Sequence, residues 1–65
     1  MKKVYLYMHH SGFDFFLSDH KLTHEEAYCP DCDESNELVG VYDNAEAIAA
    51  KIQELQKLGL DLITE

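Results

Sequence analysis

The sequence predicts a small α+β domain, in which an antiparallel sheet of three to four strands is covered by one C-terminal helix at about 44–58. Two observations lead to this class. Apolar residues follow strand-like alternation in the N-terminal third, and they recur at helical spacing in the last third. Because 65 residues build only one hydrophobic core, residues 1–65 are expected to form a single domain.

The N-terminal third predicts a β-hairpin. Residues 3–8 and 13–18 have the pattern of two strands, and Ser11-Gly12 between them is typical of a turn. Alternation places six apolar side chains on one face of the hairpin: Val4, Leu6, Met8, Phe13, Phe15 and Leu17. An isolated hairpin is marginal in water, so this face is expected to pack against another element.

Two more strands are predicted, a third at 38–42 and a last edge strand at 60–64. Gly40 inside the third strand indicates a bulge or a close approach of another group. Within the polar middle of the chain, Thr23 and Glu26 have the spacing of a capping box, which predicts one helical turn before Pro30.

The strongest helix signal begins after Asp43, the predicted N-cap, with Glu46 at the third helical position. Gly59 has the position of a C-cap glycine. Apolar residues recur at helical spacing between these ends: Ile48, Ile52 and Leu55. We expect this stripe to lie on the apolar face of the sheet.

Composition excludes several classes of function. The chain has 13 acidic residues against five lysines, no arginine, and a formal net charge of −8, so direct nucleic-acid binding is not expected. No run of 18 apolar residues is present, which excludes a membrane-spanning helix. Because the start lacks the pattern of a signal peptide and the two cysteines are too close in sequence to join distant segments, we expect a cytoplasmic protein with reduced thiols.

One motif carries chemistry. Cys29-Pro30-Asp31-Cys32 places two thiolates in one tight turn, where they can bind a single Zn²⁺. Together with Tyr28 before it, the motif resembles the knuckle of zinc-ribbon and rubredoxin-type proteins, which has the form Cys-Pro-x-Cys-Gly. Asp33 stands in place of the glycine, and aspartate tolerates a positive φ better than most residues.

The resemblance covers residues 4–42 and includes a degenerate first knuckle at 8–12. Gly12 and the aromatic residues after it fit the family, but Met8 and Ser11 occupy the positions of its first two cysteines. The resemblance implies zinc-ribbon-like hairpins and a structural zinc ion.

Zinc requires further ligands, and four histidines are candidates. His9 and His10 lie inside the degenerate first knuckle, whereas His20 and His24 precede Cys29 by nine and five residues. The sequence does not select between these pairs. The candidate metal ligands are therefore Cys29, Cys32, His9, His10 and His24, with His20 expected to be solvated.

These observations predict a small acidic module that is not an enzyme, in which zinc has a structural role and which acts through protein–protein contacts as a monomer or homodimer. The alternative is a metal-free acidic inhibitor or adaptor that occupies a basic surface of a partner. A redox Cys-x-x-Cys is disfavoured, because the acidic residues around the motif oppose a reactive thiolate. A metal-free descendant of a ribbon, with its knuckle kept as a turn, is also open.

Overall fold

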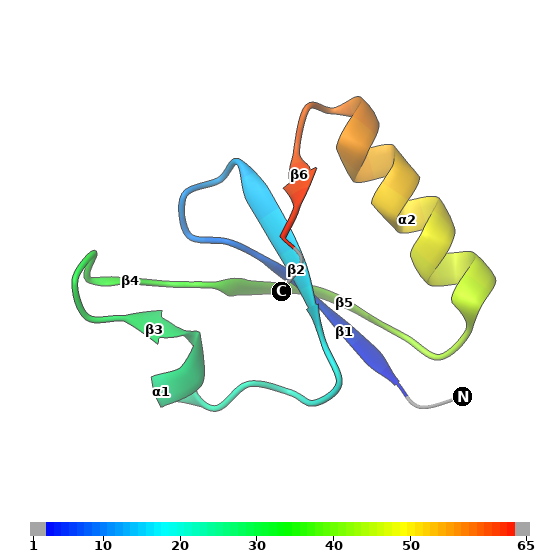
Figure 1. Ribbon diagram of the computed structural model, residues 1–65. Coiled ribbons are helices and arrows are strands. Elements are labelled where there is room, and N and C mark those ends of the chain that lie inside the picture. The colour runs from blue at the N-terminus through cyan, green and yellow to red at the C-terminus, as the bar shows by residue number, and fades with distance from the viewer. Residues whose placement is uncertain (1–2, 64–65) are drawn as a thin grey trace.

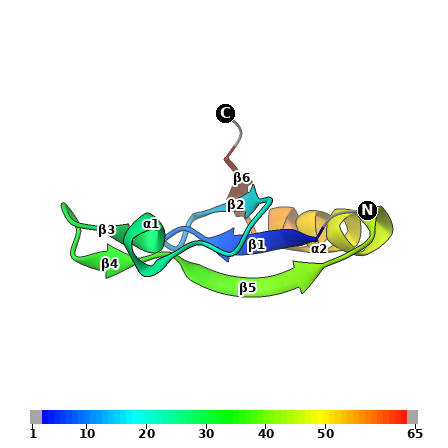
Figure 2. The ribbon, with the colours of Figure 1, turned by 90° about the horizontal axis from the view of Figure 1, so that it is seen from below.

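The computed structural model describes residues 3–63 and confirms a small α+β fold with its main helix near the C-terminus (Figure 1). The elements are β1 (Val4–Met8), β2 (Asp14–Ser18), α1 (His24–Ala27), β3 (Tyr28–Cys29), β4 (Glu34–Ser35), β5 (Glu37–Tyr42), α2 (Ala45–Lys57) and β6 (Asp61–Leu62). Four strands form the main sheet in the order β5-β1-β2-β6, and β3 and β4 form a separate two-stranded sheet. Figure 2 shows the main sheet in this order, with β5 along one edge and β6 at the other.

The main sheet is mixed, so the prediction of a purely antiparallel sheet was wrong. Strand β1 pairs antiparallel with both β2 and β5, but β6 pairs parallel with β2, with Phe15 opposite Leu62. The reason is the path of the chain: α2 returns it along the sheet, so β6 runs in the same direction as β5 and β2. Of the strand predicted at 60–64, β6 covers Asp61–Leu62, and residue 64 lies outside the described residues.

The β1–β2 hairpin forms as its sequence predicts. Its register pairs Leu6 with Leu17 and Met8 with Phe15, which places the apolar residues of the two strands on one face. The turn is closed by the His9 N–H, which donates to the Asp14 carbonyl at 2.9 Å. Gly12 has a φ of 81°, a conformation that L side chains rarely adopt.

The core lies between this face and α2. Leu6 and Phe15 are fully buried, and Ile48 and Leu55 of α2 pack against them, which confirms the predicted helical stripe. Six partly buried side chains surround this cluster: Val4, Met8, Tyr42, Ile52, Leu60 and Leu62. Phe13 does not join them and is 74% exposed, because it precedes β2 in the turn.

The ends of α2 differ from the prediction by one residue at the start. Asn44, rather than Asp43, is the N-cap, and its side chain accepts from the Ala47 N–H at 2.7 Å. The amide oxygen satisfies a donor that the first turn leaves unpaired, and asparagine and aspartate serve this role equally well. At the other end Gly59 has a φ of 91°, as expected for a residue after the C-cap.

Strand β5 contains the irregularity that Gly40 predicts. The register between β1 and β5 shifts between Leu6 and Tyr7, so that Gly40 and Leu38 face them and Val39 is the extra residue of a bulge. A Cβ at Gly40 would lie 3.0 Å from the hydroxyl oxygen of Tyr42, so the close approach is present as well.

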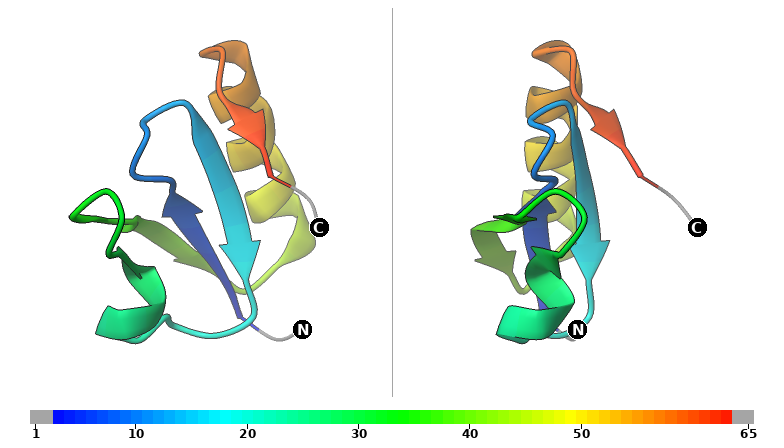
Figure 3. Two further views of the ribbon diagram at one scale, coloured as in Figure 1. Left: turned by 60° about the vertical axis from the view of Figure 1, so that its left-hand side comes forward. Right: turned by 90° about the vertical axis from the view of Figure 1, so that its left-hand side faces the viewer.

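Residues 19–36 form the connection between β2 and β5. Because both strands run antiparallel to β1, this connection has to return along the sheet. It does so on the side opposite α2, as the two views of Figure 3 show for α1 and the β3–β4 hairpin. The Leu22 N–H donates to the Tyr7 hydroxyl at 2.8 Å, which anchors it to the sheet face that α2 does not cover. Within residues 3–63 no helix has the length and apolar character needed to cross a membrane.

Candidate metal centre

The two cysteines lie at the tip of the β3–β4 hairpin. Its register pairs Tyr28 with Ser35 and Cys29 with Glu34, so that residues 30–33 form the loop. Helix α1 precedes this hairpin and has the predicted capping box, with bonds in both directions between Thr23 and Glu26. The chain therefore enters the knuckle directly from a short, capped helical turn.

Asp33 has a left-handed backbone conformation at the end of the loop. Its φ is 54°, and it is the one non-glycine residue with positive φ among residues 3–63. The Tyr28 hydroxyl donates to Asp33 Oδ1 at 2.5 Å, which bridges the base of the loop. Asp33 therefore has the positive φ that aspartate tolerates better than most residues.

The β1–β2 turn brings His10 to the knuckle. The His10 N–H donates to Asn36 Oδ1 at 3.0 Å, and the Asn36 N–H donates to the Ala27 carbonyl at 2.8 Å. Asn36 therefore connects the hairpin turn to the segment that carries the thiols. The His10 side chain is 12% exposed, so the protein covers most of it.

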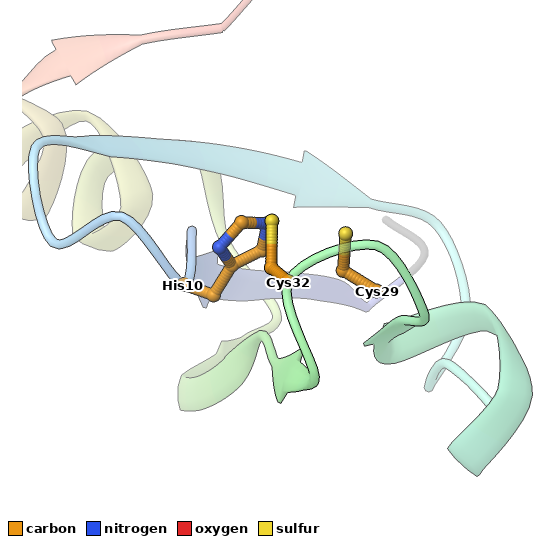
Figure 4. Close-up of side chains that lie close together, drawn as sticks. All are labelled: His10, Cys29 and Cys32. Carbon is orange, nitrogen blue, oxygen red and sulfur yellow. The ribbon is translucent and has the colours of Figure 1, made fainter.

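His10, Cys29 and Cys32 form a group that can hold a metal ion. One ligand atom from each lies within 4.8 Å of the other two (Figure 4). His10 and Cys29 are partly buried, and Cys32 is exposed. Two sulfurs and one imidazole nitrogen are a donor set that suits Zn²⁺ and related metals rather than Ca²⁺ or Mg²⁺.

The environment of the thiols favours a cation. The pKa of Cys32 is raised, chiefly by a hydrogen bond with Cys29, then by partial burial and by the negative charges of Cys29 and Glu34. A raised pKa disfavours the free thiolate form of Cys32. A divalent cation reverses this balance, because it stabilises both thiolates at once.

The other three histidines lie outside this group. His9 Nδ1 is 2.9 Å from Ser11 Oγ, and its ring centroid is 4.0 Å from that of His10. His24 is the first residue of α1, exposed, and stacked on Tyr28 with ring centroids 6.0 Å apart.

His20 lies between two carboxylates on the surface. Its Nδ1 is 2.7 Å from Asp19 Oδ1, and its Nε2 is 3.1 Å from Glu26 Oε2. The pKa of His20 is raised, chiefly by the hydrogen bond to Asp19 and then by that to Glu26. Both ring nitrogens are thus engaged within its own segment, away from the thiols.

Two residues of the site were not predicted from the sequence. Asn36 is held by its backbone and side-chain bonds described above, and no local pattern distinguishes it from other turn residues. Glu34 lies directly across the ladder from Cys29, and its Oε2 is 3.5 Å from His10 Nδ1. Glu34 could not be predicted without the register of the β3–β4 hairpin, because it is the antiparallel pairing around a four-residue loop that puts positions 29 and 34 side by side.

The three donors of the group come from the β1–β2 turn, from strand β3 and from the loop that follows it. No protein-family model, curated protein or solved structure matches this chain.

Proposed function

We propose that the chain is a small metal-binding module, in which Zn²⁺ bound by His10, Cys29 and Cys32 has a structural role and which acts through protein–protein contacts. The observation that carries the proposal is the convergence of the three donor atoms within 4.8 Å, since His10 is far in sequence from the Cys29–Cys32 motif. Chance proximity of one histidine to a Cys-x-x-Cys turn is possible for any surface, but here Asn36 holds both segments in register.

The structural role follows from how little else holds the connection 19–36. None of its described side chains belongs to the hydrophobic core or to the residues packed against it. Its links to the sheet include the bond from Leu22 to Tyr7 and the bond from His10 to Asn36. A metal ion that joins position 10 to the knuckle supplies the missing attachment, and zinc binding in small modules contributes roughly 10–16 kcal/mol of apparent free energy.

The knuckle supports zinc over a redox role. Strands β3 and β4 flank the loop, and Asp33 has the left-handed backbone. These are features of a zinc-ribbon-type knuckle, with His10 in place of the ligands that the first knuckle lacks. A structural ion in such a site would hold the fold rather than take part in a reaction, so we propose no catalysis.

Strand β5 is the surface that best supports a role in protein contacts. It lies at the edge of the sheet, and three of its aliphatic side chains are exposed: Leu38, Val39 and Val41. Exposed aliphatic groups beside unpaired backbone donors and acceptors are typical of a site where another chain adds a strand.

Native mass spectrometry tests the metal site. Untagged protein, purified without chelator, is expected to carry one zinc ion per chain and to lose it on unfolding. The C32S and H10A variants are expected to bind Zn²⁺ more weakly by more than about 100-fold, because loss of a direct ligand weakens binding more than loss of a group that only orients a ligand. The matched control is H24A, which removes an exposed histidine outside the group and is expected to leave affinity unchanged.

A folded protein without bound zinc, whose circular dichroism is unchanged by added Zn²⁺ or by a chelator, would overturn the proposal. Equal affinity in H10A and H24A would overturn the ligand assignment. The first result would favour the metal-free alternative, an acidic adaptor whose negative surface contacts a basic partner.

A further inference from the structure

We infer that Glu34 is the fourth ligand of this metal ion, so that the site is a closed set of one histidine, two cysteines and one glutamate. The inference rests on the proposed function, since it concerns the same ion. A structural zinc site takes four ligands in tetrahedral geometry, and the three donors of the group leave one position to be filled. Glu34 lies beside this position: its carboxylate approaches His10 but is outside the set of atoms that all lie within 4.8 Å of one another, so it reaches the ion by rotation of its exposed side chain.

The first step is the register of the knuckle hairpin. Cys29 and Glu34 are directly opposite each other in the antiparallel β3–β4 ladder. Side chains of directly paired residues project from the same face, with Cβ atoms about 4.5–5.5 Å apart. Glu34 therefore projects on the face that carries the Cys29 thiol, whereas its neighbour Ser35 projects on the opposite face.

The second step is a distance. Glu34 Oε2 lies 3.5 Å from His10 Nδ1. Two ligands bound at 2.0–2.2 Å with a tetrahedral angle between them are about 3.3–3.6 Å apart. The same separation is too long for a charge-assisted hydrogen bond, which is about 2.7–2.9 Å. The carboxylate is thus spaced from this ring nitrogen as two ligands of one ion can be.

The third step is the availability of the carboxylate. The Glu34 side chain is 60% exposed, so it can turn toward an ion without breaking a buried contact. Asp33, the neighbouring carboxylate, is engaged by the Tyr28 hydroxyl. Two thiolates, one imidazole and one carboxylate fill all four positions around the ion and leave none for water. This agrees with a structural ion and not with a catalytic one.

Replacement of Glu34 by cysteine tests the assignment by a gain of signal. Co²⁺ is the probe, because thiolate-to-cobalt charge-transfer absorption grows with the number of bound thiolates. The experiment titrates Co²⁺ into reduced wild type, E34C and S35C, and compares the absorption per bound ion. Two thiolates become three in E34C, so its absorption is expected to rise about 1.5-fold. S35C places its thiol on the opposite face and is expected to match wild type.

The outcomes separate this inference from the proposed function. A wild type without the charge-transfer band overturns the proposed metal site itself. A wild type with the two-thiolate band, together with E34C absorption equal to that of S35C, overturns only the assignment of Glu34.

A second variant covers the case in which E34C does not fold. E34Q keeps the size of the side chain and removes its charge, and it is expected to weaken Co²⁺ binding about tenfold or more, as loss of a metal-site group does. Unchanged Co²⁺ affinity in folded E34Q would overturn the assignment. E37Q, which removes an acidic charge from β5, is the control for a general effect of net charge.

Discussion

Asp33 shows how one residue decides the shape of the knuckle. Its left-handed backbone is a conformation that glycine adopts freely and alanine adopts at a cost of about 1 kcal/mol or more. D33G and D33A both lose the contact with Tyr28, so their difference reports the backbone alone. We expect D33G to be more stable than D33A by about 1 kcal/mol in urea unfolding of the zinc-saturated protein.

The matched control for Asp33 is Ser35, which lies in β4. In a strand, glycine is less stable than alanine by roughly 0.5–1 kcal/mol, so S35G is expected to be less stable than S35A. The order of the two variants should thus be inverted between positions 33 and 35. The same order at both positions would contradict the role given to the Asp33 backbone.

His20 and Glu26 predict a pH dependence. The raised pKa of His20 means that its protonated form favours folding, a contribution present below about pH 6.5 and lost as pH rises through the raised value. The pKa of Glu26 is lowered, chiefly by the backbone hydrogen bond from Thr23 and then by His20. Its contribution is present above about pH 4.5 and lost as pH falls through the lowered value. Both contributions are therefore present between about pH 4.5 and 6.5.

NMR titration of the His20 ring checks this. D19N is expected to lower the midpoint of His20 more than E26Q does, because the bond to Asp19 is the larger cause of the shift. Glutamine keeps the capping box, so E26Q leaves α1 formed. E46Q, in the first turn of α2, is the control and should leave the midpoint unchanged. A midpoint unaffected by both D19N and E26Q would contradict the described pairing.

At the scale of elements, α2 holds the fold through a narrow stripe. Leu55 is 5% exposed in the core, whereas Leu58, one turn later, is 73% exposed. We expect L55A to lower the free energy of unfolding by about 2–5 kcal/mol, and L58A to change it by less than about 0.5 kcal/mol. Chemical denaturation followed by circular dichroism measures both, and similar losses in the two variants would contradict the packing.

The elements with a strong local signal were predictable from the sequence. The β1–β2 hairpin, the bulge at Gly40, the capping box at Thr23 and the stripe of α2 all follow from patterns within a few residues. The parallel pairing of β6 was not predictable, because a two-residue strand has no periodicity that shows its direction. It depends on the path of α2, which is a property of the whole chain.

The candidate metal centre was also predictable from the sequence only in part. The thiols of Cys29 and Cys32 follow from a local motif, whereas the choice of His10 among four histidines depends on tertiary structure. His9 and His10 are adjacent in sequence, and only the direction in which the β1–β2 turn presents them separates their surroundings.

At the scale of the whole molecule, repulsion among the excess negative charges lowers the stability of the folded state. A net charge of −8 on 65 residues produces repulsion that extends about 30 Å at 0.01 M salt and about 10 Å at 0.1 M. We expect NaCl between 0.01 and 0.5 M to stabilise the protein by about 1 kcal/mol, or roughly 4–8 °C in Tm. Differential scanning calorimetry at constant zinc concentration measures this shift.

A variant with fewer charges serves as the control. The substitutions E25Q, E37Q and D43N change the net charge from −8 to −5, because each removes one negative charge. The same salt range should then produce a smaller rise in Tm. A Tm that stays constant or falls with added NaCl in the wild type would contradict dominant self-repulsion.

Strand β6 is attached to β2 by two paired residues, with the Asp61 N–H on the Phe13 carbonyl at 3.1 Å and the Ile63 N–H on the Phe15 carbonyl at 2.8 Å. With β6 in place, β5 is the long open edge of the main sheet and β6 offers an edge of only two residues on the other side, so we expect copies to associate as closed pairs through β5. Local detachment of β6 exposes the edge of β2, so that one molecule then has a long strand edge, open to pairing with another chain, on each side of the sheet. Copies with two such edges add head to tail without closure, which is the geometry of a fibre. We therefore expect β6, although it has only two residues, to prevent polymerisation by covering the edge of β2.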